Sequence, residues 1–349
     1  MKLIQAGSKY IGSGQPCFIA AEIGINHNGD MLLAKRMIDA AVDAGTDAVK
    51  FQNYRTEDFL SDRSLTYTYE SQGKQVTEPQ FDMFKRCELS VPQLQELRQH
   101  CETRGVIFLS TPTGEDGIRD LIAAGAPLLK NGSDYLTHLP LIRSMARTGL
   151  PTILSTGMAT LEEVEDAVAA FKKAGGTELL ILHCTSSYPT PATEVNLRKI
   201  TTLSATFGCP VGFSDHSWGT TAALGAVVLG ACFIEKHFTL DKNLPGPDHR
   251  FSSDPEEFRE LVMRVREIEQ NMGDAHIGPT PSETKNRQSF RLSCVAARDL
   301  NPGHVIELGD IAFRRPGSGL PPKKIVVLLG KSTKRKILFG EALVIDDVD

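Results

Sequence analysis

Two histidines stand at the ends of apolar runs and could bind one metal ion together. His216 lies in GFSDHSWG and His237 in IEKHFTLD. A single histidine in such a place is more often a hydrogen-bonded polar group than a ligand. Adjacent strands, however, lie about 4.8 Å apart, so imidazoles on neighbouring strand ends can reach one cation. Because two nitrogens leave coordination positions open, we expect an exchangeable Lewis-acid ion such as Mn²⁺ or Mg²⁺.

Two lysines also interrupt apolar runs at their C-terminal ends. Lys50 and Lys130 must each reach solvent, pair with an acid or bind an anion. With the hydroxyls that end other runs they would form a donor-rich ring largely free of acceptors, which suits a ligand carrying phosphate and carboxylate. The hydroxyl residues are Ser110, Thr111, Ser133, Ser155, Ser186 and Ser214. A Schiff-base lysine is the alternative, but two lysines and many hydroxyls exceed what imine chemistry needs.

Acidic residues complete the set of candidate functional groups. Glu22 lies between apolar neighbours on a predicted buried strand, where burial would perturb its acidity, so it is our candidate for moving a proton or orienting water. Asn26 and His27 follow in a turn and are explained equally well by turn chemistry. Asp248, in PGPDHR, either lies in an ordinary loop or accepts hydrogen bonds from a polyol over the site.

Eight short apolar runs must position these side chains. Continuous β-branched and aliphatic runs with helical patterns between them indicate parallel strands buried on both faces, and the simplest closure is a (β/α)8 barrel, whose chemistry lies where the strands end. The runs are CFIAAEIG (17–24), AVKFQN (48–53), VIFLSTP (106–112), PLLKNGS (127–133), PTILSTG (151–157), ELLILHCTS (178–186), PVGFSDH (210–216) and CFIEKHFT (232–239).

The segments between the runs are mostly helical in pattern. Amphipathic spacing with capping signals predicts helices over 32–45, 90–105, 161–176 and 255–273. Residues 54–90 are too long for one helix, and we expect them to overhang the barrel mouth as a lid. The Pro-rich stretch 278–288 reads as a linker, and short runs broken by NPG, PGSG and LFG after it predict a small β-rich domain.

Composition limits the classes of function. The 349 residues suit one barrel of about 250 residues plus a small domain. A formal net charge of −5 gives no reason to expect nucleic-acid binding. Seven dispersed cysteines without CxxC indicate buried thiols in a reducing compartment. The most apolar segment, 222–234, is shorter than the roughly 20 residues of a membrane span. We therefore expect a cytoplasmic protein that does not enter the membrane.

Several of these motifs together resemble the sialic acid synthase family of phosphoenolpyruvate-dependent nonulosonate synthases. They are AEIGINHNGD, VKFQ, FLSTP, ILSTGM, ILHCTSSYPTP, GFSDH, GAC, IEKHFTLD, GPDH and RRPGSG. The resemblance implies a TIM barrel over 1–275, a linker over 276–290 and a C-terminal antifreeze-like (SAF) domain over 291–349. It also implies a homodimer in which each SAF domain covers the barrel of its partner.

The resemblance further assigns roles to matching positions. His216 and His237 would bind a divalent ion, Mn²⁺, Mg²⁺ or Co²⁺, and Glu22, Lys50 and Lys130 would be catalytic. Phosphoenolpyruvate would be held by Lys50, Thr111, Lys130, Ser133, Ser155, Ser186 and Ser214. The sugar would be held by Tyr188, Asp248 and the partner's Arg315, so RRPGSG would not be the ordinary basic turn that its composition indicates.

Two departures from the family pattern fall on ligand contacts. Family members carry an acid shortly after the GS of the fourth strand, where this chain has Tyr135, or Asp134 after a shift, and an asparagine where it has Ser186. The expected reaction condenses phosphoenolpyruvate with N-acetylmannosamine or a 2,4-diacetamido-trideoxyhexose to a nine-carbon 2-keto acid. The alternatives are a phosphorylated aldose as acceptor, or non-enzymatic binding of ice or polysaccharide by the C-terminal domain.

Overall fold

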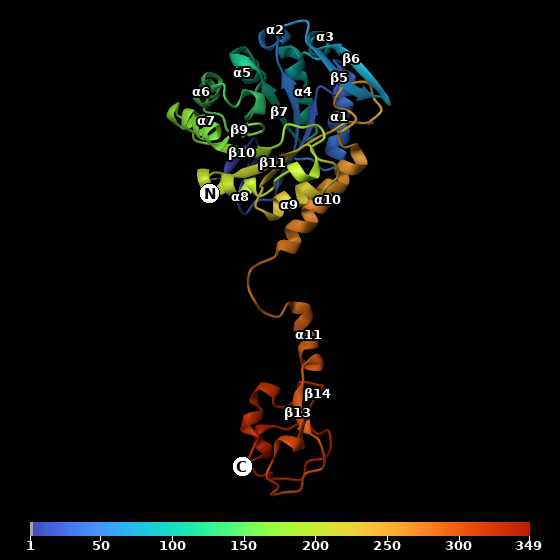
Figure 1. The fold of residues 1–349 in the computed structure, drawn as a ribbon, viewed down its shortest axis with the longest axis vertical. Coiled ribbons are helices and arrows are strands. Elements are labelled where there is room, and N and C mark those ends of the chain that lie inside the picture. The colour runs from blue at the N-terminus through green and yellow to red at the C-terminus, as the bar shows by residue number, and fades with distance from the viewer. Residues whose placement is uncertain (1–2) are drawn as a thin grey trace. The chain divides into compact units, whose positions relative to one another are not determined.

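The computed structural model describes residues 3–349 and divides into two compact units, one ending at Gly273 and the other running from Asp274 to Asp349. The first unit is built on eight parallel strands whose hydrogen-bonded order is β7-β4-β3-β12-β11-β10-β9-β8 (Figure 1). The strands at the two ends of this order, β7 and β8, pack against each other and nearly close the sheet into a barrel. The predicted (β/α)8 barrel is thereby confirmed.

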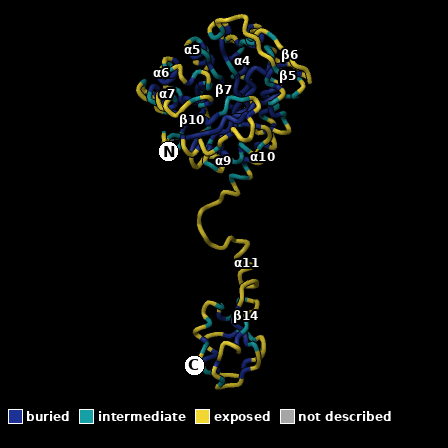
Figure 2. Tube along the Cα trace, in the orientation of Figure 1, coloured by how far each residue is buried: buried dark blue, intermediate teal, exposed yellow. Residues whose placement is uncertain are grey.

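The barrel strands coincide with the eight apolar runs. They are β3 (Phe18–Gly24), β4 (Ala48–Asn53), β7 (Ile107–Pro112), β8 (Leu129–Asn131), β9 (Thr152–Ser155), β10 (Leu179–Cys184), β11 (Val211–Asp215) and β12 (Phe233–His237). Almost every residue in them is buried, as expected for strands covered by helices outside and filled by side chains inside (Figure 2).

Eight helices follow the strands and pack their apolar faces on the outside of the barrel. They are α1 (Met31–Asp43), α4 (Val91–Thr103), α5 (Gly114–Ala124), α6 (Leu139–Arg147), α7 (Leu161–Lys173), α8 (Lys199–Phe207), α9 (Thr221–Val228) and α10 (Pro255–Met272). The predicted starts are confirmed where capping boxes form, at Ser90, Thr160 and Asp254. Thr160 and Asp254 accept from backbone N–H groups that the first helical turn leaves unpaired, and at Ser90 the side chain of Gln93 accepts from the Ser90 N–H.

A short N-terminal hairpin, which the sequence did not reveal, fills one end of the barrel. Strands β1 (Ile4–Ala6) and β2 (Lys9–Ile11) pair antiparallel. Ile4 and Ile11 join the cluster of buried side chains inside the barrel, where the rings of Phe18 and Phe233 stack 5.2 Å apart. Both phenylalanines begin their strands, so apolar packing occupies this end and polar groups gather at the other.

Residues 54–90 are more ordered than the long loop that was expected. They form α2 (Thr56–Phe59), the antiparallel strands β5 (Thr66–Ser71) and β6 (Lys74–Pro79), and α3 (Gln80–Lys85). Tyr54 anchors this segment. Its ring packs edge-on against the rings of Phe59 and Phe84, with centroids 5.3 and 5.6 Å apart. The expected long loop is therefore a hairpin on its own small apolar cluster.

The tip of the hairpin is tied to the segment after β12. The Gly246 N–H donates to Ser71 Oγ at 3.3 Å, and Gln72 Nε2 donates to the Asn243 carbonyl at 3.2 Å. Glu70 and Arg250 form an ion pair between the same two segments. Because both segments follow strand ends, the hairpin lies over the end of the barrel where polar side chains collect.

The second unit has its own small core. Strands β13 (Ser293–Ala296) and β14 (Ile311–Arg314) pair antiparallel, and three short 3-10 helices complete it: η3 (Leu308–Asp310), η4 (Pro322–Val327) and η5 (Ile345–Asp347). Cys294, Leu328 and Ile337 are fully buried there. The segment that reads as a linker contains a helix, α11 (Pro281–Phe290), whose side chains are exposed (Figure 2).

Among the described residues, no helix is long and apolar enough to cross a membrane.

Candidate functional site

A cavity of about 510 Å³ opens at the carboxyl ends of the barrel strands. It gathers most of the side chains that the sequence singled out: Glu22, Lys50, Thr111, Lys130, Ser133, Tyr135, Ser155, Ser186, Tyr188, Ser214, His216 and His237. Parallel strands that end at the same edge of a closed sheet bring residues distant in sequence to one place, so the predicted convergence is observed.

Three predicted residues do not line this cavity. Ser110 is fully buried and its Oγ donates to Asn53 Oδ1 at 2.8 Å, so it does not belong to the expected hydroxyl ring. Asp248 lies beside the cavity, with Oδ2 3.9 Å from His237 Nδ1. Arg315 belongs to the second unit, where it is exposed and its guanidinium lies 5.1 Å from the centre of the Phe290 ring.

Glu22 and Lys50 form a buried ion pair at the base of the cavity. They are register partners on β3 and β4, with Lys50 Nζ 2.8 Å from Glu22 Oε2. Lys50 also donates to Thr111 Oγ1 at 3.0 Å, and Gln52 Nε2 donates to Glu22 Oε1 at 3.0 Å. Burial raises the pKa of Glu22, and the Lys50 ammonium only partly offsets this. The carboxyl therefore holds a proton more readily than an exposed glutamate does.

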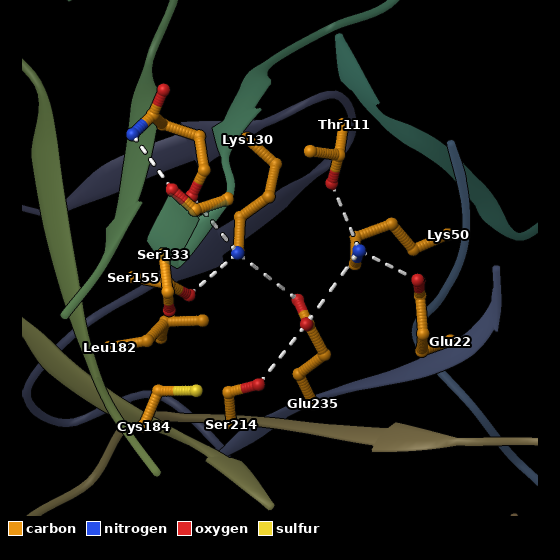
Figure 3. A network of polar contacts seen from close by, with 12 residues as sticks. Glu22, Lys50, Thr111, Lys130, Ser133, Ser155, Leu182, Cys184, Ser214 and Glu235 are labelled. Atoms are coloured by element: carbon orange, nitrogen blue, oxygen red, sulfur yellow. Dashed lines mark hydrogen bonds and ion pairs between the residues drawn. The ribbon is translucent and has the colours of Figure 1, made fainter. Parts of the chain in front are cut away.

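The sequence did not identify the acid at the centre of the site, Glu235. Its carboxylate lies between the two ammonium groups, 3.7 Å from Lys50 Nζ and 3.9 Å from Lys130 Nζ, and accepts from Ser214 Oγ at 3.2 Å (Figure 3). The sequence predicts a ring of donors largely free of acceptors, and this prediction is wrong because Glu235 lies within the ring. Strand alternation was the missed signal, because a residue two positions before His237 shares its inward face.

Charges balance within this cluster. Burial alone would raise the pKa of Glu235, but the ammonium groups of Lys130 and Lys50 lower it. Burial alone would likewise lower the pKa of Lys50, which Glu22 and Glu235 raise. Two carboxylates thus neutralise two ammonium groups in a region from which water is largely removed. An incoming anion would compete with Glu235 for the same ammonium groups.

Lys130 lies beside a pocket of hydroxyls and a backbone N–H. Its Nζ donates to Ser155 Oγ at 2.6 Å, and burial lowers its pKa. Nearby, the Gly157 N–H donates to Ser133 Oγ at 3.0 Å. A Cβ at position 157 would lie 2.2 Å from Ser186 Oγ and 2.7 Å from Ser133 Oγ, so any larger residue there would displace both hydroxyls. We call Ser133, Ser186 and the Gly157 N–H the Gly157 cradle, and its donors suit an oxyanion.

His216 and His237 face one another, with ring centroids 5.4 Å apart. His216 Nδ1 lies 2.9 Å from the Thr185 carbonyl oxygen, which can only accept, so Nδ1 carries the proton and Nε2 keeps a lone pair. His237 Nδ1 is buried without a hydrogen-bond partner, and burial lowers the pKa of this histidine well below its ordinary value. Burial would lower the pKa of His216, but its contacts with Cys184 and the Thr185 carbonyl raise it. In their neutral forms, the two imidazoles offer His216 Nε2 and His237 Nδ1 to a divalent metal ion.

The described residues offer only these two imidazoles at the expected metal position. No group of three or more histidine, cysteine, aspartate or glutamate side chains with metal-binding geometry occurs within residues 3–349. An ion held here would therefore keep open coordination positions, as a Lewis-acid site that also binds substrate requires.

Aromatic side chains form the outer wall of the cavity. The Tyr188 ring packs 4.2 Å from His216 and 5.2 Å from Phe251, measured between centroids. The wall continues with Tyr54, Tyr67, Tyr135 and Met158. Asp134 and Tyr135 both line the cavity, so the structure places both candidates for the missing family acid at the site.

Asp248, beside the cavity, has a shifted acidity. Burial, followed by the Glu22 carboxylate, raises its pKa to about 7.

The sequence matches the model of the NeuB family over residues 37–277 and that of the SAF domain over residues 293–349. The chain belongs to the NeuB family. At the level of this family the activity is the condensation of phosphoenolpyruvate with an amino sugar, and the protein is accordingly an enzyme of the transferase class.

Individual relatives agree along the whole chain. An uncharacterized protein of Methanocaldococcus jannaschii is 41% identical, over 100% of this chain and 99% of its own length. An N,N'-diacetyllegionaminic acid synthase of Legionella pneumophila is 38% identical, over 98% of each chain. The crystal structure of an N-acetylneuraminic acid synthetase from Leptospira borgpetersenii is 35% identical, with a TM-score of 0.74 over 82% of this chain and 95% of that one.

Replacing Glu235 tests the charge balance directly. Glu235→Gln leaves two buried ammonium groups with one carboxylate, and we expect a loss of unfolding free energy on the order of 3 kcal/mol in anion-free buffer. Inorganic phosphate should then raise the thermal midpoint more in the variant than in the wild type, because it no longer competes with a carboxylate. Thermal unfolding across a phosphate titration measures both effects.

The matched control is Glu102→Gln on α4, where the carboxylate is 67% exposed and pairs with Arg98. This variant should respond to phosphate as the wild type does. An equal phosphate response in Glu235→Gln would contradict the assignment of Glu235 as the group that an anion displaces.

Proposed function

We propose that the protein condenses phosphoenolpyruvate with an N-acylated hexosamine to a nine-carbon 2-keto acid and releases phosphate. The acceptor is N-acetylmannosamine or a 2,4-diacetamido-trideoxyhexose. The observation that carries the proposal is that two lysines, Lys50 and Lys130, and two histidines, His216 and His237, line one cavity. A phosphorylated enol acid and a sugar aldehyde can then meet there.

Phosphoenolpyruvate carries a phosphate and a carboxylate, and the donor set can bind both. Lys130, Ser155 and the Gly157 cradle with Ser133 and Ser186 supply donors on one side of the cavity. Lys50, Thr111 and Ser214 supply donors on the other side. Glu235 lies between the two sides, so its displacement from the ammonium groups accompanies binding in this proposal.

The sugar would occupy the aromatic outer part of the cavity. Tyr188 and Tyr135 would offer hydroxyl groups to a polyol and pack their rings against its apolar face, and Asp248 would offer a carboxyl group from beside the cavity. A divalent ion held by the two histidines would polarise the aldehyde oxygen of the open-chain sugar. The name of the Legionella relative supports a diacetamido sugar as one of the two acceptors to be tested.

The covalent steps follow from this arrangement. C3 of phosphoenolpyruvate attacks the aldehyde carbon, which forms the new carbon–carbon bond and leaves positive charge at C2 beside the phosphate ester; the aldehyde oxygen takes up a proton and becomes a hydroxyl. Water adds at C2 and releases a proton that balances the one taken up, and phosphate leaves with cleavage of its bond to C2 as the 2-keto group forms. Glu22, with its raised pKa, orients that water or takes its proton. Lys50 and Lys130 stabilise the negative charge of the phosphate.

The protein would act as a cytoplasmic homodimer in which SAF domains are exchanged. All seven cysteines are free thiols, which supports a reducing compartment. The site of one chain would be completed by the partner's Arg315. In the second unit Arg315 is exposed, as a residue that reaches another chain must be.

A panel of acceptors tests the reaction. With phosphoenolpyruvate and Mn²⁺ we expect phosphate release that requires N-acetylmannosamine or a 2,4-diacetamido-trideoxyhexose and does not occur with either substrate alone. The measurement is inorganic phosphate production, with mass spectrometry of the acid product. Faster release with a phosphorylated aldose than with either N-acyl sugar would contradict the proposal.

Replacing the acid at the base of the cavity tests its role in the proton step. Glu22→Gln keeps an acceptor for Lys50 and a similar shape but cannot take a proton. We expect binding of both substrates within a few-fold of wild type and turnover lower by about 10²–10⁴. Calorimetric titration and single-turnover kinetics separate the two effects. Near-normal turnover would remove the role assigned to Glu22.

Co-expression of two inactive variants tests the exchange of domains. Lys130→Ala removes a group of the barrel, and Arg315→Ala removes the group contributed to the other subunit. In an exchanged heterodimer one site is intact, because its barrel comes from the Arg315→Ala chain and its arginine from the Lys130→Ala chain. Random pairing should restore about a quarter of wild-type activity. No recovery in purified heterodimers would contradict exchange.

A further inference from the structure

A buried ion pair outside the cavity joins the two strand ends that carry the histidines. Asp215 and Lys236 are register partners on β11 and β12, and Lys236 Nζ lies 2.7 Å from Asp215 Oδ2. Their side chains are 0% and 4% exposed, respectively. Because side chains alternate along a strand, they point away from the cavity that Ser214, Glu235 and His237 line. The pair is therefore not part of the substrate-binding surface.

The same two side chains hold the backbone that follows β11. Asp215 Oδ1 accepts from the Ser217 N–H at 2.8 Å and from Ser217 Oγ at 2.6 Å. Lys236 Nζ donates to the Ser217 carbonyl at 2.7 Å. His216 is the residue between Asp215 and Ser217, so a closed ring of contacts fixes its main chain. Lys236 directly precedes His237, and one ammonium group thus ties both imidazole-bearing positions together.

Stability alone gives a weak reason for burying this pair. Removing two charges from water costs about as much as their attraction returns, and an apolar pair of similar size would often stabilise a barrel equally well. What charges and directed hydrogen bonds provide is a fixed geometry. A metal held by only two protein side chains has no third one to correct their separation, so the spacing of the imidazoles sets its affinity.

We propose that Asp215 and Lys236 are positioning residues that set the separation of His216 and His237 for metal binding. Neither touches the metal or a substrate, and they act through the backbone on which the two imidazoles stand. The inference rests on the metal site of the proposed function. It adds the origin of the precise spacing of the imidazoles, which the two histidines cannot supply themselves.

The test is the affinity of the full-length chain for Mn²⁺ alone, measured by calorimetry and by the loss of the free-ion paramagnetic resonance signal. In Lys236→Met we expect Mn²⁺ to bind about tenfold more weakly. Phosphoenolpyruvate, titrated with a chelator present, should lose clearly less affinity than Mn²⁺, because Lys50 and Lys130 lie on other strands and only Ser214 and Glu235 neighbour the pair. A general structural defect would weaken both ligands.

The matched control is Lys9→Met. Lys9 also pairs with an aspartate, Asp47, at 2.5 Å, and it lies on the hairpin whose isoleucines pack at the other end of the barrel. This variant should leave both affinities unchanged. The double variant Asp215→Asn/Lys236→Met removes both charges, so no unpaired charge is buried, and it should fold while still binding Mn²⁺ weakly.

Each outcome decides a different claim. The positioning role alone would be overturned if a folded Lys236→Met chain bound Mn²⁺ with wild-type affinity. If that variant does not fold, the same result in the double variant would overturn it. Equal weakening of Mn²⁺ and phosphoenolpyruvate would overturn it in favour of general support of the barrel. A wild-type chain that binds no Mn²⁺ would overturn the metal site and this inference with it.

Discussion

The site depends on the balance of four charges that the barrel encloses. Lys50 and Lys130 carry positive charge where almost no water reaches them, and Glu22 and Glu235 are the carboxylates that make this tolerable. The register of the strands places these groups close together, since Glu22 is aligned with Lys50 on one side and with His237 on the other. An anionic substrate would therefore enter a cavity whose charged side chains are already held in position.

This balance explains how one cavity can serve two unlike ligands. In the proposed function, Glu235 offsets the cost of burying the two ammonium groups, and an anion would replace contacts that Glu235 makes in its absence. Burial lowers the pKa of His237, which favours the neutral imidazole that a metal ion binds. The aromatic wall around Tyr188 separates this polar interior from solvent, which strengthens every electrostatic contact inside.

Much of this architecture was predictable, because the signals are local. The eight runs end in polar residues, and a closed parallel sheet must collect such ends at one edge, which placed Lys50, Lys130, His216 and His237 correctly. Glu235 was missed and Ser110 was misassigned, although strand alternation distinguishes both. Glu235 lies two positions before His237 and shares its inward face, whereas Ser110 is next to Thr111, which lines the cavity, and contacts Asn53 instead. The N-terminal hairpin escaped prediction because long-range packing stabilises it. The hairpin of residues 66–79 escaped prediction because its strands are largely exposed and its tip is held by the distant segment after β12.

The most direct test of the central claim measures whether metal and anion occupy the same cavity. Mn²⁺ bound to the enzyme should strongly broaden the phosphorus resonance of bound phosphoenolpyruvate, because a paramagnetic ion relaxes nuclei only at short range. The broadening should disappear in His237→Ala while phosphoenolpyruvate remains bound. A sharp phosphorus resonance from an enzyme that demonstrably holds both ligands would show that the histidines and the lysines serve separate sites, and would contradict the account.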